Sequence, residues 1–235
     1  MESLVEAWEW HESDKILNVL PMHHVHGIIN TFNCALWAGA ECEMFDQKFN
    51  AGLVWERLLR EEDPVSVFMA VPTVYNSLTR HLNDGKVDKT REEIRRIFSS
   101  QYRLMVSGSA ALPETQMASW FDISGQILLE RFGMTEIGMG LSNPYHPATS
   151  RQAGHVGSPL PGVEATMCDL DTGAIFNDTD RQGELLIKSK GMFDRYLNKP
   201  EATAECFTED GWFRTGDCVA KNAETGAYKI LGRLS

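Results

Sequence analysis

Short apolar runs alternate with segments of helical periodicity from residue 16 to about residue 150, and this alternation limits the possible folds more than any other feature. The runs expected to form strands are 16–20, 41–45, 64–71, 102–108 and 125–130. The segments expected to form helices are 27–39, 51–62, 72–82, 90–100 and 113–121. Strands and helices that alternate in this way form βαβ units, which build a mostly parallel sheet with helices on both faces. We therefore expect an α/β fold with a doubly wound sheet.

The first of these helical segments has an amphipathic pattern. In "GIINTFNCALWAG" (27–39), the apolar residues Ile28, Phe32, Ala35 and Leu36 recur at helical spacing. Because residues three and four apart lie on one face of a helix, we expect these four to form one apolar helical face.

The pattern changes after about residue 155, where glycine- and aspartate-containing turns separate runs with strand character. The strand-like segments are "GVEATMCDLDTG" (162–173), "GELLIKSKG" (183–191) and "CVAKNAETGAYKIL" (218–231). Within the last of them, "NAETG" (222–226) is expected to close a hairpin, and only "KPEATAECF" (199–207) looks helical. We therefore expect an α/β part over residues 1–154 and a smaller β-rich part over residues 155–231.

The charge and the cysteines narrow the class of protein. A net charge of −11 argues against binding to nucleic acid or to an anionic membrane surface. The chain shows no signal peptide and no apolar run of the length that spans a bilayer. Its five cysteines are scattered and never form a C-x-x-C pair, which indicates reduced thiols and an intracellular location, mitochondrial or cytoplasmic.

Two segments that follow expected strands carry side chains suited to a nucleotide. In "VSGSAALP" (106–113), small residues let a ligand approach the backbone at the start of a helix. In "RFGMTE" (131–136), Phe132 could stack on a base, Thr135 could bind a phosphate and Glu136 could bind magnesium. Each segment also has a structural explanation, an ordinary strand-to-helix turn for the first and a helix cap for the second.

Two further segments leave several interpretations open. "LPMHHVHGI" (20–28) holds three histidines, which could form a metal site, start a helix with satisfied ring nitrogens, or line a substrate tunnel. No cysteine or carboxylate lies nearby at ligand spacing, so a metal site has little support. In "DGWFRTGD" (210–217), Asp217 could bind both hydroxyls of a ribose or serve as a turn residue.

Taken in order, these segments resemble the core motifs of the adenylate-forming superfamily of acyl-CoA synthetases. The matching segments are "LPMHHVHGI", "VSGSAALP", "LLERFGMTE", "GHVGSPLPG", "GELLIKSKGMFDRYLNKPEAT", "DGWFRTGD" and "GRLS". They cover essentially the whole chain. More narrowly, "VLPMHHVHGI", "MAVPTVY", "LMVSGSAALP" and "LLERFGMTEIGM" are similar to malonyl-CoA synthetases.

The resemblance implies an activity and a set of cofactors. Such enzymes join a carboxylic acid to ATP with release of pyrophosphate, and then transfer the acyl group from the adenylate to coenzyme A. The resemblance thus implies ATP, Mg²⁺ and coenzyme A, and a small carboxylic acid as the substrate. Malonate is the first candidate acid and methylmalonate the second.

The resemblance also assigns roles to individual residues. The residues implied beside the acyl group and adenine are Gly108, Ser109, Ala110 and Met134. The residues implied in nucleotide binding are Phe132 and Gly133 at the base, Thr135 at the α-phosphate, and Asp217 and Arg233 at the ribose. Glu136 is the implied magnesium ligand, and His24 is implied near the acyl carboxylate and the pantetheine path. His24, Thr135 and Glu136 are therefore the expected catalytic residues.

Arg131 is the residue that points to a dicarboxylic acid. Many members of the superfamily have an uncharged residue before the aromatic-Gly-x-Thr-Glu motif, whereas malonyl-CoA synthetases have arginine. The resemblance implies that Arg131 faces the second carboxylate of malonate, because a guanidinium fork matches a carboxylate. The alternative is a surface ion pair between Glu130 and Arg131, which would contribute little to stability.

The sequence also departs from the family in ways that leave other functions open. Nothing in it matches the family's phosphate loop, and residues 232–235 are expected to begin the hinge to a C-terminal domain, so we expect this fragment to be inactive alone. Ser77 stands where some relatives have a basic residue. The alternatives are another acyl-CoA or aryl-CoA synthetase, and a truncated nucleotide-binding protein without catalysis.

Overall fold

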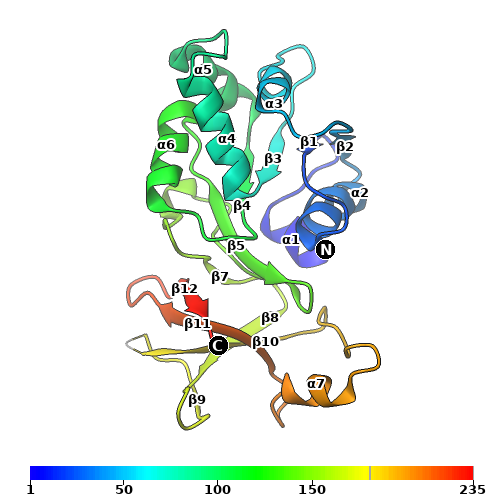
Figure 1. Ribbon diagram of the computed structural model, residues 1–235, viewed down its shortest axis with the longest axis vertical. Helices are drawn as coiled ribbons and strands as arrows, with labels where there is room; N and C mark the ends of the chain where they lie inside the picture. Colours follow the sequence, from blue (N-terminus) through cyan, green and yellow to red (C-terminus); the bar gives the residue numbers. More distant parts are fainter. Residues whose placement is uncertain (180, 235) are drawn as a thin grey trace.

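The computed structural model describes residues 1–179 and 181–234 and contains two β-sheets (Figure 1). The first sheet has the strand order β2-β1-β3-β4-β5-β6-β7. Its strands are β1 Lys15–Asn18, β2 Glu41–Met44, β3 Val67–Ala70, β4 Leu104–Ser107, β5 Leu129–Met134, β6 Gly138–Ser142 and β7 Ser158–Pro159. From β2 to β5 all neighbours are parallel, and β6 and β7 add antiparallel pairs. The predicted mostly parallel sheet is confirmed.

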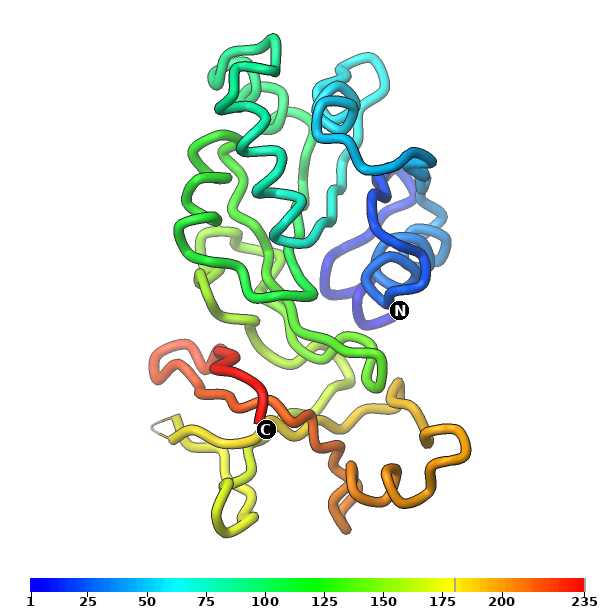
Figure 2. The backbone as a smooth tube through the Cα atoms, viewed as in Figure 1, coloured from blue at the N-terminus to red at the C-terminus, as the bar shows by residue number. Residues whose placement is uncertain are grey.

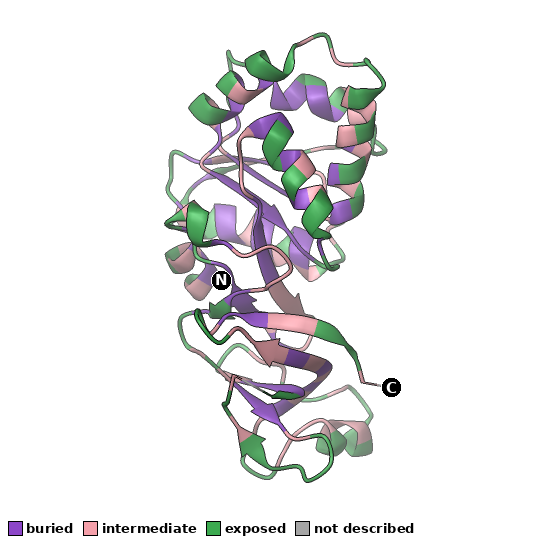
Figure 3. Cartoon of the chain, turned by 90° about the vertical axis from the view of Figure 1, so that its left-hand side faces the viewer, coloured by how far each residue is buried: buried purple, intermediate pink, exposed green. Residues whose placement is uncertain are grey.

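Helices cover both faces of this sheet (Figure 1). They are α1 Glu2–Ala7, the π-helix η1 His26–Asn33, α2 Cys34–Ala38, α3 Ala51–Leu58, α4 Pro72–Asn83, α5 Arg91–Gln101 and α6 Glu114–Ser124. A short 3₁₀ helix, η2 Ala148–Ser150, lies in the loop before β7. Successive strand residues point to opposite faces, so Phe68 packs in the core under α3 to α6 and Met69 in the core under α1 and α2. Buried strands between two such cores explain the near-continuous apolar runs of the sequence (Figure 3).

The second sheet is antiparallel, with the order β12-β11-β10-β8-β9. Its strands are β8 Val163–Cys168, β9 Ile175–Phe176, β10 Gln182–Ser189, β11 Phe213–Lys221 and β12 Tyr228–Arg233, and α7 Pro200–Glu205 lies between β10 and β11. The predicted hairpin turn forms at Asn222, whose N–H donates to the Ala227 carbonyl at 2.9 Å. The chain crosses from the first sheet to the second between β7 and β8 (Figure 2). The division at residue 154 and the hinge role of residues 232–235 stay predictions, and Ser235 lies outside the described residues.

Two local expectations were wrong. Ile28 and Leu36 are exposed, whereas Asn30 and Cys34 are fully buried, because residues 26–33 form a π-helix and its i→i+5 hydrogen bonds change the residue spacing. The fifth strand does not end at residue 130. It runs to Met134, because its second half pairs with β6 in an antiparallel hairpin.

Candidate active site

A cavity of about 390 Å³ lies between the two sheets, lined by the end of β4 and the turn after it, by β5, and by β11 and β12. Ligands of open α/β sheets bind outside the carboxyl ends of the parallel strands, so this is the expected place for a site. Predicted site residues in its lining are Ser109, Ala110, Arg131, Phe132, Gly133, Asp217 and Arg233. The structure thus brings together residues that are more than 100 positions apart in the sequence.

The turn after β4 shapes one wall of this cavity. Ser109 has a φ of +69°, in the left-handed region that few residues other than glycine adopt. Such strain at a non-glycine residue is typical of functional sites. Gly108 touches Arg131, because a Cβ atom added at Gly108 would lie 2.4 Å from Cζ of Arg131. Only glycine therefore lets the guanidinium lie this close to the backbone.

Arg131 is a buried cation without an anionic partner in the described part of the chain. Its residue exposure is 4%, and Nη2 donates a hydrogen bond to Ser109 Oγ at 3.3 Å. Its Nε is buried without a hydrogen-bond partner, and no carboxylate of the described residues lies within salt-bridge distance. Burial lowers the pKa of Arg131 to about 9. An unpaired buried charge is costly, so the site is suited to an anionic ligand.

His26 lies beside Arg131 and was not among the predicted site residues. It is 2% exposed, and its Nδ1 lies 3.2 Å from Ser109 Oγ. Burial, followed by the nearby Arg131 charge, holds the pKa of His26 well below its usual value, so the ring is neutral. The sequence offered one relevant signal, the suggestion that one histidine of "LPMHHVHGI" lines a substrate tunnel.

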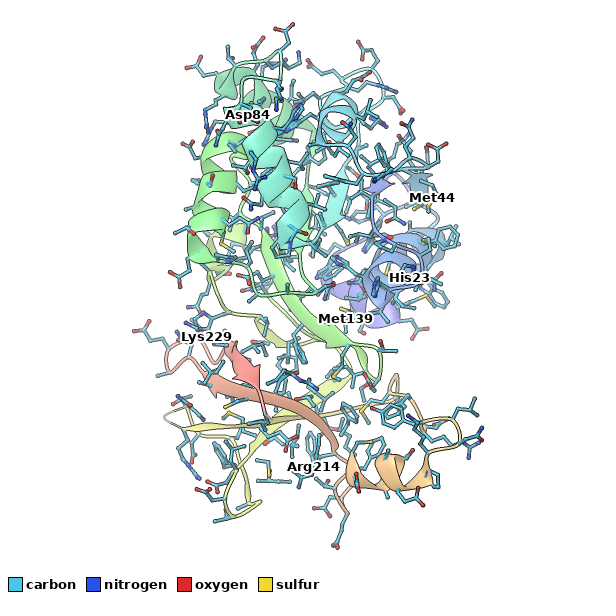
Figure 4. The ribbon with its side chains drawn as sticks, in the orientation of Figure 1. His23, Met44, Asp84, Met139, Arg214 and Lys229 are labelled. Carbon is cyan, nitrogen blue, oxygen red and sulfur yellow. The ribbon has the colours of Figure 1, made fainter. Side chains whose placement is uncertain are left out.

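His24 lies outside this cavity. His23 and His24 are exposed, with ring centroids 4.5 Å apart, and Figure 4 shows His23 beside the helical segment of residues 26–38. The role predicted for His24 stays a prediction.

Glu130 is buried next to Arg131, which excludes the surface ion pair considered above. Its carboxylate accepts a hydrogen bond from the Gly154 N–H at 2.9 Å. The pKa of Glu130 is raised to about 7, mainly by burial and to a smaller extent by the carboxylate of Glu114, against the lowering effect of backbone hydrogen bonds from Gly154 and Leu112. Glu130 therefore fixes the loop containing Gly154 against the cavity, where Gly154 and Val156 are part of the lining.

The tip of the β5–β6 hairpin carries the predicted phosphate and magnesium residues. Thr135 is exposed and lines a second cavity of about 780 Å³, together with Val25 and Trp37. Glu136 is half-buried, and its Oε1 accepts a hydrogen bond from the Tyr196 hydroxyl at 2.9 Å. Met134 lines neither cavity. Thr135 therefore lines a different cavity from Phe132 and Gly133, although the three are close in sequence.

Asp217 and Arg233 face each other across β11 and β12. Arg233 Nη1 donates to Asp217 Oδ2 at 3.1 Å and to the Thr215 carbonyl at 2.8 Å. Burial raises the pKa of Asp217, and Arg233 opposes this rise. Asp217 lies within a strand, so the turn-residue alternative was wrong.

The described residues contain no group of three or more histidine, cysteine or acidic side chains that could enclose a metal ion. This leaves the histidine metal site of the sequence analysis without support. Magnesium, however, is usually held by one or two carboxylates together with substrate phosphates. Glu136 is a carboxylate with one oxygen held by Tyr196, and it fits a magnesium ion that arrives with a nucleotide. Within the described residues, no helix is long and apolar enough to cross a membrane.

Comparison with known proteins gives consistent matches. A family model described as AMP-binding enzyme matches residues 1–197. Malonate–CoA ligase ACSF3, mitochondrial, of Bos taurus is 44% identical over 255 residues, covering 99% of this chain and 42% of that protein. ATP-bound MatB from Rhodopseudomonas palustris superposes with a TM-score of 0.85 at 33% identity, covering 99% of this chain and 42% of that one. A malonyl-CoA ligase product complex with methylmalonyl-CoA and AMP gives 0.83 at 33% identity, covering 99% and 46%. The chain spans less than half the length of these proteins.

Proposed function

The chain belongs to the AMP-binding enzyme family, and from this premise we propose that it is part of a ligase that activates malonate with ATP and transfers the malonyl group to coenzyme A. The similarity to the bovine malonate–CoA ligase supports this substrate. Methylmalonate is a second proposed substrate, supported by the product complex of the similar malonyl-CoA ligase. Because the relatives are more than twice as long, we do not expect these 235 residues to catalyse the reaction alone.

The observation that carries the proposal is the buried guanidinium of Arg131, which has no anionic partner among the described residues. A dicarboxylate presents one carboxylate for reaction and a second for recognition. The second would pair with Arg131, with Ser109 Oγ holding the guanidinium in place. A monocarboxylic acid would instead place an apolar end against the charge.

In the proposed reaction, a carboxylate oxygen of malonate attacks the α-phosphorus of ATP and pyrophosphate leaves. The thiol of coenzyme A then attacks the acyl carbon, AMP leaves, and the thiol proton passes to solvent or to a nearby base. Both steps depend on positioning and charge neutralisation more than on a protein nucleophile. Magnesium, when bound, would neutralise charge on the ATP phosphates.

The chain's own residues would bind and orient the reactants. We propose that Phe132 and Gly133 contact the adenine, that Asp217 and Arg233 bind the ribose, and that Thr135 binds the α-phosphate. Glu136 would hold the magnesium ion. Gly108, Ser109, Ala110 and Met134 would border the acyl group, and His24 would lie on the path of the coenzyme A thiol. The mitochondrial name of the bovine relative supports an intracellular location.

The decisive test is Arg131→Leu in the complete gene product that contains this chain. Loss of a buried charge partner should cost about 2–4 kcal/mol of transition-state binding. This corresponds to a fall of roughly 30- to 1,000-fold in kcat/KM for malonate, whereas butyrate should be unaffected or improved. The ratio of the two kcat/KM values cancels any general loss of folded enzyme.

An unchanged ratio, with both acids falling together, would mean that Arg131 supports the loop or the nucleotide. A parent protein that prefers butyrate or an aromatic acid would instead support one of the other CoA synthetases.

A further inference from the structure

Glu136, the proposed magnesium ligand, lies in a turn whose own residues do not fix the conformation of its side chain. Glu136 is in the tight turn between β5 and β6, where the Ile137 N–H donates to the Met134 carbonyl at 3.2 Å. Thr135 beside it is exposed. A carboxylate at an exposed hairpin tip has several accessible rotamers, and it binds a cation well only when one of them is selected.

The loop between β10 and α7 holds Glu136 in place. Between β10 and α7, the Phe193 N–H donates to the Glu136 carbonyl at 2.8 Å, and the Tyr196 hydroxyl donates to Glu136 Oε1 at 2.9 Å. In Figure 1 this segment follows β10 and passes close to the tip of the green hairpin. One hydrogen bond fixes the backbone of Glu136 and the other fixes its side chain.

The supporting segment is itself well anchored. Phe193 packs against Phe207 and Phe213, with ring centroids 5.7 and 5.6 Å away. The Tyr196 N–H donates to Thr203 Oγ1 of α7 at 3.0 Å. The hydroxyl of Tyr196 is therefore presented to a hairpin of the first sheet by an anchored loop between β10 and α7.

We propose that Tyr196 is a positioning residue for magnesium, which holds Glu136 Oε1 so that Oε2 faces the metal bound to ATP. Oε2 has no hydrogen-bond partner among the described residues. This role rests on the proposed function in one respect, because both take Glu136 as the magnesium ligand.

The test is Tyr196→Phe in the complete gene product, which removes the hydroxyl and keeps the ring. Partners that orient metal ligands typically contribute 10- to 100-fold to metal affinity. We therefore expect the Mn²⁺ concentration for half-maximal binding of a fluorescent ATP analogue to rise by roughly 10- to 100-fold. Glu136→Gln should raise it at least as much.

Tyr228→Phe is the matched control. It removes a hydroxyl that donates to the Ala165 carbonyl at 3.3 Å, within the second sheet, and that makes no hydrogen bond to Glu136. This variant should keep the parent Mn²⁺ dependence even if its unfolding temperature falls as much as that of Tyr196→Phe. A Tyr196→Phe protein with the parent Mn²⁺ dependence would overturn the proposal.

The failure of the proposed function would look different. If the parent binds Mn²⁺ and nucleotide through Tyr196 and Glu136 but forms no malonyl-CoA, the malonate assignment fails and the positioning role stands. If the parent forms malonyl-CoA and Tyr196→Phe leaves Mn²⁺ binding unchanged, the malonate assignment stands and the positioning role fails.

Discussion

At the scale of the residue, Gly108 determines where the guanidinium of Arg131 can lie, because it has no side chain. A Cβ atom at Gly108 would meet Cζ of Arg131 at 2.4 Å and Nε at 2.6 Å, so Gly108→Ala must displace the guanidinium. A displacement of about 1 Å at a positioned group can cost on the order of 100-fold in rate. We expect kcat/KM for malonate to fall by roughly 10- to 100-fold and that for butyrate to change much less. Equal losses for the two acids would contradict a role for Gly108 in placing Arg131.

Glu130 should make stability depend on pH. Its pKa is raised to about 7 in the folded protein from its ordinary value of 4.5, so folding favours the protonated form. The stabilisation from this proton is complete below about pH 4.5 and is lost as pH rises to about 7. A shift of this size corresponds to at most about 3 kcal/mol. Glu130→Gln, which stays neutral and can still accept from Gly154, should lose less stability between pH 5 and pH 8 than the parent.

The measurement is the free energy of unfolding by denaturant at both pH values. A Glu130→Gln variant with the same loss as the parent would show that other groups cause the pH dependence.

At the scale of the element, the close pairing of β5 and β6 depends on glycine at position 133. A Cβ atom at Gly133 would lie 2.2 Å from the Gly138 carbonyl oxygen and 2.4 Å from Cε of Met139. The first contact is with backbone, which cannot move without opening the hairpin. Gly133→Ala should therefore lower the free energy of unfolding by about 1–3 kcal/mol.

Gly140→Ala in the same hairpin is the control, because the atoms nearest to its Cβ would be side-chain ends, Cδ1 of Ile137 at 3.2 Å and Cδ1 of Ile187 at 3.5 Å. Thermal and denaturant unfolding of the two variants compare them directly. A larger loss for Gly140→Ala would contradict the assigned cause.

The same elements show where sequence patterns stop being informative. The spacing of apolar residues and the positions of turn residues predicted α4, α5 and the parallel strands, because buried strands and amphipathic helices each have a recognisable local sequence pattern. They could not predict that β5 continues through the Phe132–Gly133 segment, since this depends on pairing with β6. They also could not identify His26, since the π-helix that it begins, and in which it is buried, has no simple sequence pattern.

At the scale of the whole molecule, the cavity exists only because the two sheets meet. Arg131 and Phe132 come from the first sheet, and Asp217 and Arg233 from the second. Local patterns predicted both sheets separately. Their juxtaposition followed only from the family resemblance, because contacts between residues so distant in the chain leave no periodic signal.

A nucleotide bound in this cavity should therefore join the two sheets. Ligand binding stabilises the folded state in proportion to the logarithm of the ligand concentration relative to its Kd. Saturating AMP should raise the unfolding temperature of the complete gene product and slow amide hydrogen exchange in both β5 and β11. Slower exchange in one sheet alone would place the nucleotide elsewhere.

Asp217→Ala tests the contribution of the second sheet to nucleotide binding. If the carboxylate accepts hydrogen bonds from the ribose hydroxyls, its loss should cost about 1.5–3 kcal/mol, which is roughly a 10- to 150-fold rise in the Kd for AMP. The malonate requirement should change little, because Arg131 lies on the other sheet. Asp171→Ala, at an exposed turn of the second sheet away from the cavity, is the control for a general effect of charge. Calorimetry with AMP on the three proteins decides the matter, since an unchanged Kd in Asp217→Ala would leave Asp217 with only its structural pairing to Arg233.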